Sequence, residues 1–113
     1  MSDAVSEFKR FVDIVRSLRE PEKGCPWDLE QDHRSLRPYL IEETHEVIEA
    51  IDTGNDALLC EELGDVLLQV VLHAQVAQDR KAFTIENVIT YVADKMVRRH
   101  PHVFGDRTVT NSA

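Results

Sequence analysis

Apolar residues recur at every third or fourth position along most of the chain, and no segment convincingly alternates at every second position. This spacing is typical of α-helices, whose turns hold about 3.6 residues, and not of strands. We therefore expect an all-α chain that resembles a four-helix bundle. The predicted helices span residues 5–18, 35–51, 57–78 and 85 to just before Pro101.

Residues that cap or stop helices separate these segments. Two prolines and a glycine in "EPEKGCPWD" divide the first helix from the second. Short polar side chains are favoured at helix starts, whereas glycine and proline mark helix ends. For the second helix we expect Ser35 as the N-cap, with Pro38 tolerated in the first turn, and Gly54 near its end. Asn55 or Asp56 should cap the third helix and Thr84 the fourth, which Pro101 should stop.

Length and charge narrow the class of protein. The 113 residues fit one small domain, which we place at 1–105, followed by a flexible tail at 106–113. A formal net charge of −8 argues against nucleic-acid binding, which selects basic surfaces. Two cysteines make a poor disulfide framework, and no apolar run approaches the roughly 18 residues that a membrane helix requires. We therefore expect a cytoplasmic protein.

Acidic residues occupy positions of helix 35–51 that should be apolar. On a wheel at about 100° per residue, Glu43 falls inside the apolar arc, between Val47 and Ala50. Glu46 lies at the edge of this arc, one turn further along, whereas Glu42 lies on the opposite, solvated side. Exposure to water therefore does not explain Glu43 and Glu46.

Helix 57–78 repeats this anomaly. Its apolar residues cover most of its circumference, and Glu62, Asp65, Gln69 and His73 form a narrow polar stripe. A buried carboxylate must be protonated, paired with a cation or bound to a metal, because an isolated buried charge costs too much free energy. Two acids three residues apart on each of two helices suggest one shared positive ligand. His73 lies about three turns from Glu62, too far to join one small metal site.

The candidate ligands favour Mg²⁺, with Mn²⁺ as a substitute, because all of them are carboxylate oxygens. Mg²⁺ in such sites usually completes its coordination with water and substrate phosphates, so we expect a phosphate-bearing substrate. The last helix ends with Lys95, Arg98 and Arg99, which suit phosphate oxygens that the metal leaves bare. Two alternatives are that these bases pair with the acids in a structural network, or that they only complement the helix C-terminus.

The segments "EETHE" and "EELGD" resemble the EExxE…ExxD signature of the MazG-type nucleoside triphosphate pyrophosphohydrolases. The flanking segments "GCPWDLEQDHRSLRPYLIEE" and "DKMVRRHPHVFG" are similar to the same family, and the resemblance covers residues 8–105. It implies an all-α fold whose Mg²⁺ sites lie between helices and serve to hydrolyse nucleoside triphosphates to nucleoside monophosphate and pyrophosphate. Many relatives carry two such domains in tandem, and this chain resembles the amino-terminal copy.

The resemblance assigns roles by motif position. The implied metal ligands are Glu43, Glu46, Glu62 and Asp65. The implied phosphate contacts are Lys95, Arg98 and Arg99. The ligand set agrees with the positions that the helical wheel singles out.

Further candidates flank these residues. Glu42 is our candidate for the acid that orients the attacking water, and Glu61 joins the substrate-binding set. For both acids the alternatives are a place near a second metal or a solvated helix face. Trp27, the only tryptophan, either packs its loop or stacks on a base. Asp28 and Gln31 follow it, and we expect them to help shape the same pocket.

Two functions of another class stay open from the sequence. A domain that kept the fold and the acids could be a non-catalytic oligomerisation or nucleotide-sensing module. A carboxylate-bridged di-iron bundle would need a second Glu-x-x-His pair, which the sequence does not have in place.

Helix 57–78 also predicts assembly. A helix in a lone bundle needs one apolar stripe, yet this helix is apolar on nearly every side. Leu67, Val70, Val71 and Ala74 point away from the acids and need cover that three other helices do not obviously supply. We expect a homodimer, with pairing of two dimers into a tetramer as an alternative. The resemblance implies the same, because MazG relatives assemble as dimers or larger.

Overall fold

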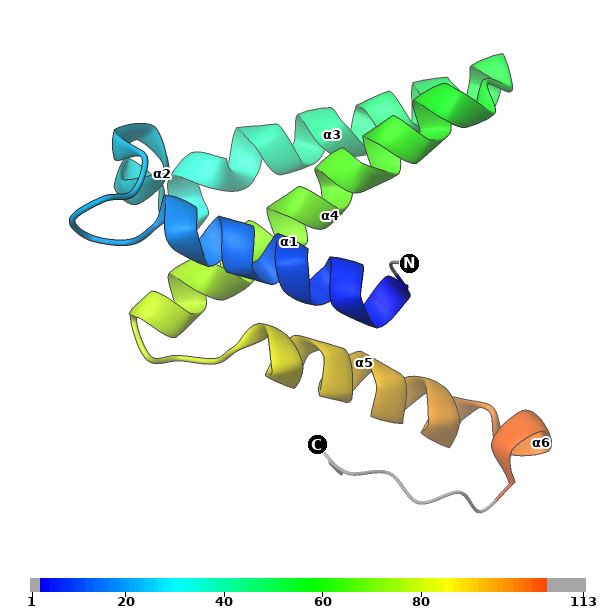
Figure 1. Cartoon of the computed structure of the whole chain (residues 1–113). Helices are drawn as coiled ribbons and strands as arrows, with labels where there is room; N and C mark the ends of the chain where they lie inside the picture. Colours follow the sequence, from blue (N-terminus) through cyan, green and yellow to red (C-terminus); the bar gives the residue numbers. More distant parts are fainter. Residues whose placement is uncertain (1–2, 106–113) are drawn as a thin grey trace.

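All regular secondary structure in the computed structural model, which describes residues 3–105, is helical (Figure 1). The prediction of an all-α chain is therefore confirmed for this part of the chain. The tail expected at 106–113 lies outside the described residues. The helices are α1 (Ala4–Leu18), α2 (Pro26–Glu30), α3 (His33–Thr53), α4 (Asp56–Asp79), α5 (Ile85–Arg99) and α6 (Pro101–Phe104).

The longest helices, α3 and α4, form an antiparallel hairpin with a tight turn (Figure 1). Gly54 ends α3 in the left-handed conformation, with a φ of 69°, which glycine adopts without the steric penalty of a side chain. Asn55 then caps α4, because its side chain accepts a hydrogen bond from the backbone N–H of Leu58 at 3.0 Å. Both predicted signals are confirmed.

Helix α3 begins two residues earlier than predicted. Asp32 is the N-cap, and Ser35 forms the other half of a reciprocal capping box: each side chain bonds the other residue's backbone N–H, at 2.7 and 2.9 Å. Pro38 therefore lies in the second turn, where its missing N–H leaves the carbonyl of Arg34 without its helical donor. The Nε atom of Arg37 donates to that carbonyl at 3.3 Å and compensates for the loss.

The apolar core surrounds the second half of α4. Helix α1 packs on it from one side, the start of α5 from another, and Leu36 of α3 is fully buried beneath them. The first half of α4 and the second half of α3 project away from α1 and α5 as the tip of the hairpin (Figure 1). The core residues are Val12, Val15, Leu36, Val71, Leu72, Ala74, Val76 and Ile85.

The expectation that α4 is buried nearly all round is wrong from its start as far as Val70. Leu67 is 42% exposed and Val70 is also exposed, whereas Val71 and Ala74 are covered by the chain itself. Beyond the groove that Gly64 and Leu67 line with α1, the projecting ends of the two helices have only each other as neighbours (Figure 1), so only one face of each is covered. For the same reason much of the apolar arc predicted for α3 is exposed, including Ile48 at 50%.

The sequence pattern did not predict the two short helices. Helices α2 and α6 have five and four residues, which is too short for a helical period to be visible. Each starts with a proline, a residue favoured in the first turn of a helix, so Pro101 begins α6 as well as ending α5. None of the described helices is both long and apolar enough to cross a membrane. The cytoplasmic location stays a prediction.

Candidate metal centre

Acidic side chains from both helices of the hairpin converge between them. Glu43 of α3 and Glu62 and Asp65 of α4 each place one carboxylate oxygen within 4.8 Å of those of the other two. Glu43 and Glu62 are half-buried and Asp65 is exposed. The helical wheel predicted this, because an acid inside the apolar arc of α3 must face the helix that packs against that arc.

The electrostatics of the cluster favour a bound cation. Partial burial, followed by the charges of Asp65 and Glu62, raises the pKa of Glu43 above its ordinary value. Partial burial, followed by the charges of Asp65 and Glu46, raises the pKa of Glu62 in the same direction. Every charged neighbour that contributes to these shifts is acidic. Carboxylates that repel one another in this way are stabilised by a positive ion between them.

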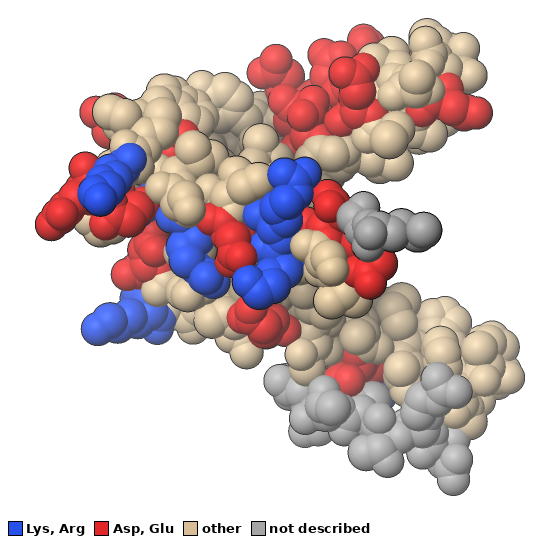
Figure 2. Space-filling view, in the orientation of Figure 1, with Lys and Arg blue, Asp and Glu red and all other residues tan. Residues whose placement is uncertain are grey.

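Glu46 and the outer acids surround this cluster more loosely. Glu46 is half-buried and contributes to the raised pKa of both Glu43 and Glu62, but it is not one of the three acids that converge within 4.8 Å. Glu42 and Glu61 are exposed. The charge of Glu42 helps to raise the pKa of Glu43, and the charge of Glu61 helps to raise the pKa of Glu62. Figure 2 shows the acidic side chains gathered on the projecting half of the hairpin, without basic side chains among them on this face.

The basic residues of α5 do not meet the acids within one chain. Helix α5 packs on the second half of α4 through Ile85 and Val88, and α1 lies between α5 and the hairpin tip (Figure 1). The Nζ atom of Lys95 lies 5.3 Å from the ring centre of Tyr91, on its own helix. Among the ion pairs of the described residues, none includes any of the four proposed ligands. The structure therefore gives no support to a structural ion-pair network, and the phosphate role of α5 stays a prediction.

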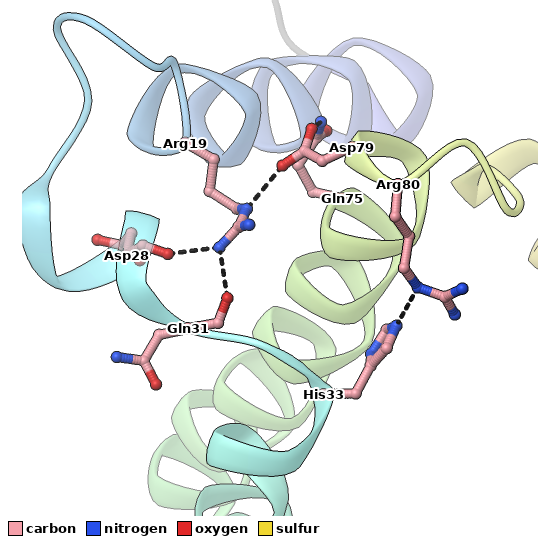
Figure 3. Close-up of polar contacts among 7 residues, drawn as sticks. All are labelled: Arg19, Asp28, Gln31, His33, Gln75, Asp79 and Arg80. Carbon is pink, nitrogen blue, oxygen red and sulfur yellow. Dashed lines mark hydrogen bonds and ion pairs between the residues drawn. The ribbon is translucent and has the colours of Figure 1, made fainter.

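The loop and short helix that carry Trp27 are held by one buried arginine. The Nη1 atom of Arg19 donates to the backbone carbonyls of Asp28 and Gln31, the latter at 3.0 Å (Figure 3). The side-chain amide of Gln31 donates to the carbonyl of Trp27 at 2.9 Å. The Trp27 ring is half exposed and meets the ring of Tyr39 edge-on, with centroids 5.7 Å apart. The Gln31 side chain and the backbone carbonyls of Asp28 and Gln31 thus hold the loop. The pocket role of Asp28 and Gln31 and a stacking role for Trp27 stay predictions.

Sequence reasoning missed two groups of contacts. One is the Arg19 side chain, which gave no periodic signal because it follows the last apolar position of α1. The other is a contact between His33 and His73, whose parallel rings meet edge to edge with Nδ1 atoms 2.8 Å apart. His73 stood out on the polar stripe of α4, and the structure pairs it with His33. No pattern pointed to its partner 40 residues earlier.

The fold and the cluster together define an all-α domain with converging carboxylates between two antiparallel helices. The model of the MazG nucleotide pyrophosphohydrolase domain matches residues 31–104, and the chain belongs to this family.

Relatives with curated names match nearly the whole chain. It is 60% identical over 106 residues to the nucleoside triphosphate pyrophosphohydrolase/pyrophosphatase MazG of Thermotoga maritima, covering 94% of this chain and 41% of that protein. It is 44% identical over 109 residues to the nucleoside triphosphate pyrophosphohydrolase of Escherichia coli K12, covering 96% of this chain and 41% of that protein. The chain thus spans about two fifths of the length of these relatives.

Proposed function

We propose that this domain hydrolyses nucleoside triphosphates to nucleoside monophosphate and pyrophosphate, with Mg²⁺ at the carboxylate cluster and Mn²⁺ as a substitute. The observation that carries the proposal is the convergence of Glu43, Glu62 and Asp65 between α3 and α4. Membership in the MazG family supports the reaction class, as do the names of the Thermotoga maritima and Escherichia coli relatives.

The cluster has the donor chemistry that this cation requires. Glu43, Glu62 and Asp65 would hold the metal, with Glu46 at the border of the cluster as the fourth proposed ligand. Hard carboxylate oxygens suit Mg²⁺ and Mn²⁺. When bound, the metal supplies neutralisation of the triphosphate charge and activation of water. Positioning and charge stabilisation would then account for most of the rate, as in phosphoryl transfer generally.

Other side chains are proposed to bind and orient the reactants. Glu42, exposed beside Glu43, is proposed to orient the attacking water, and Glu61, exposed on α4, is proposed to contact the substrate. The half-exposed ring of Trp27 offers a surface for the base. Lys95, Arg98 and Arg99 are proposed to bind phosphate oxygens. Because α5 lies apart from the acids in one chain, these bases reach the substrate only if α5 moves or a second copy supplies them.

The proposed reaction is tested by measuring pyrophosphate release from a panel of common and damaged nucleoside triphosphates with Mg²⁺ present. We expect nucleoside monophosphate and pyrophosphate in equal amounts, and no release after chelation of the metal or in the variant Glu43→Gln. Glu22→Gln, which changes an exposed acid outside the cluster, is the matched control and should keep full activity. Nucleotide binding without release would instead favour the non-catalytic, nucleotide-sensing module.

We also propose that the domain acts as a homodimer, with a tetramer as the larger alternative. The exposed apolar residues of the hairpin support this, because several large apolar side chains exposed on a small domain can be covered by a second copy. They lie on both helices, at Ile41, Ile48, Ile51, Leu63, Leu67 and Val70.

A further inference from the structure

A line of polar side chains continues from the carboxylate cluster along α4. Asp65, Gln69 and His73 are four residues apart, so they lie on one face of the helix with steps of about 6 Å along its axis. Gln69 is only 6% exposed and His73 is half-buried. Buried polar side chains are almost always hydrogen-bonded, so Gln69 and His73 should have hydrogen-bond partners. The acid cluster alone does not account for their burial.

The hydrogen positions at the far end of the line follow from two contacts. The Nε atom of Arg80 donates to Nε2 of His33 at 3.3 Å, so that nitrogen carries no hydrogen (Figure 3). A neutral His33 therefore carries its hydrogen on Nδ1, which lies 2.8 Å from Nδ1 of His73. His73 must accept at Nδ1, and its own hydrogen is on Nε2. Burial, and then the neighbouring His33, lower the pKa of His73 and keep its ring neutral.

Two atoms in the middle of the line are buried without a hydrogen-bond partner among the described residues. They are Nε2 of His73, which is a donor, and Oε1 of Gln69, which is an acceptor. The two atoms are complementary and belong to residues one turn apart, a spacing that a rotation of the Gln69 side chain can bridge. Only the carbonyl end of the Gln69 amide can face the N–H of His73. With the carbonyl end so placed, the NH₂ end is free to reach toward Asp65, the next residue on that face.

We propose that Gln69 is a positioning residue for the metal ligand Asp65. It accepts a hydrogen bond from His73 and donates one to the Asp65 carboxylate, which fixes the direction in which that carboxylate presents its free oxygen. Arg80 and His33 set the orientation of the amide through the hydrogen on His73. The inference rests on the proposed metal centre. Hydrogen-bond partners of metal ligands commonly change metal affinity about 10- to 100-fold when they are removed.

Direct binding of Mn²⁺ to the purified chain, followed by electron paramagnetic resonance and calorimetry, tests the proposal. Gln69→Met keeps the length of the side chain and removes its hydrogen bonds, and we expect it to weaken Mn²⁺ binding at least about tenfold. At saturating Mn²⁺ its kcat should stay within about twofold of the wild type, because the ligands themselves are intact. Gln69→Leu serves as a second variant if Gln69→Met does not fold.

The matched control is Gln75→Met. Gln75 is a buried glutamine of the same helix, 7% exposed, but it bonds Asp79 at 2.9 Å, away from the acid cluster. It should lower stability and leave Mn²⁺ affinity unchanged. His73→Phe should weaken Mn²⁺ binding on its own and add little to Gln69→Met, because both variants break the same chain of hydrogen bonds.

The outcomes separate this inference from the proposed function. A wild-type chain that binds no Mn²⁺ would refute the metal centre and the positioning role together. Wild-type Mn²⁺ affinity in the Gln69 variants would overturn the positioning role alone. Unchanged Mn²⁺ affinity with weaker nucleotide binding would also overturn it, because the buried pair would then contact the substrate and not Asp65.

Discussion

The Nε atom of Arg19 and the carboxylate of Asp79 lie 2.8 Å apart and connect the end of α1 to the end of α4 (Figure 3). The same guanidinium donates from Nη1 to the carbonyls of Asp28 and Gln31. The Arg19 side chain is only 9% exposed, whereas the Asp79 side chain is 40% exposed. The planar guanidinium of Arg19 therefore fixes both the end of α4 and the loop that carries Trp27.

Replacing this arginine should loosen the loop. We expect Arg19→Met to lower the free energy of unfolding by about 1–3 kcal/mol, because two part-buried carbonyls lose their donor. Arg19→Lys should be hardly more stable than Arg19→Met, since one ammonium group cannot reproduce the N–H donors of a planar guanidinium. Urea unfolding measures the stability, and the fluorescence of Trp27, the only tryptophan, reports on the loop. Arg16→Met, which breaks an exposed pair with Asp13, is the control and should change stability by less than about 1 kcal/mol.

Neutralising one proposed metal ligand should remove activity and keep the fold. Glu43→Gln or Asp65→Asn deletes a charge from a cluster whose acids repel one another, so the metal-free variant should melt at the same temperature as the wild type or higher. Mg²⁺ should raise the melting temperature of the wild type and not of the variants. Turnover near that of the wild type at saturating Mg²⁺ would contradict the ligand assignment, and unfolding of the variants would favour a structural role for the acids.

The basic end of α5 should contribute more to nucleotide affinity than to stability. Lys95→Ala or Arg98→Ala is expected to weaken binding of a triphosphate about tenfold, because each removes a charge-assisted contact to phosphate. For Lys95 the stability loss should stay near 1 kcal/mol or less, the usual value of an exposed cation–π contact such as the one with Tyr91. Calorimetry with Mg²⁺ present measures both variants. Unchanged affinity in both would refute the phosphate role.

The contact between His33 and His73 predicts a loss of stability in acid. The pKa of His73 lies below the ordinary value of 6.5 in the folded chain, so the unfolded chain binds a proton more readily. The stabilising contribution of the neutral ring is therefore complete above about pH 6.5 and decreases as the pH falls through and below that value. Urea unfolding between about pH 7.5 and 5 should show this loss. His73→Leu should reduce the pH dependence, and His102→Asn, at an exposed site, should not.

The sequence predicted the parts of this structure that depend on local geometry. The apolar period identified the four long helices, and Gly54 and Asn55 identified the turn of the hairpin. The position of Glu43 inside an apolar arc predicted that it faces α4, because a wheel records the direction of a side chain. Local geometry carries no information about which distant segments meet. The contacts of His33 with His73 and of Arg19 with Asp79 were therefore missed, and the distance of α5 from the acids was not foreseen.

Charge placed on the exposed apolar face of the hairpin tests the proposed assembly. Leu67 is 42% exposed and Ile48 is 50% exposed, so a polar residue at either position costs an isolated chain little. In a homodimer that buries this face, Leu67→Glu or Ile48→Glu would place an unpaired charge in an apolar interface, which is strongly unfavourable. We expect both variants to become folded monomers at micromolar concentration in light scattering, with helical content unchanged. Lys23→Glu, a charge change in an exposed loop, should leave the assembly intact. A wild-type chain that is a stable, well-folded monomer would show that the exposed face needs no second copy.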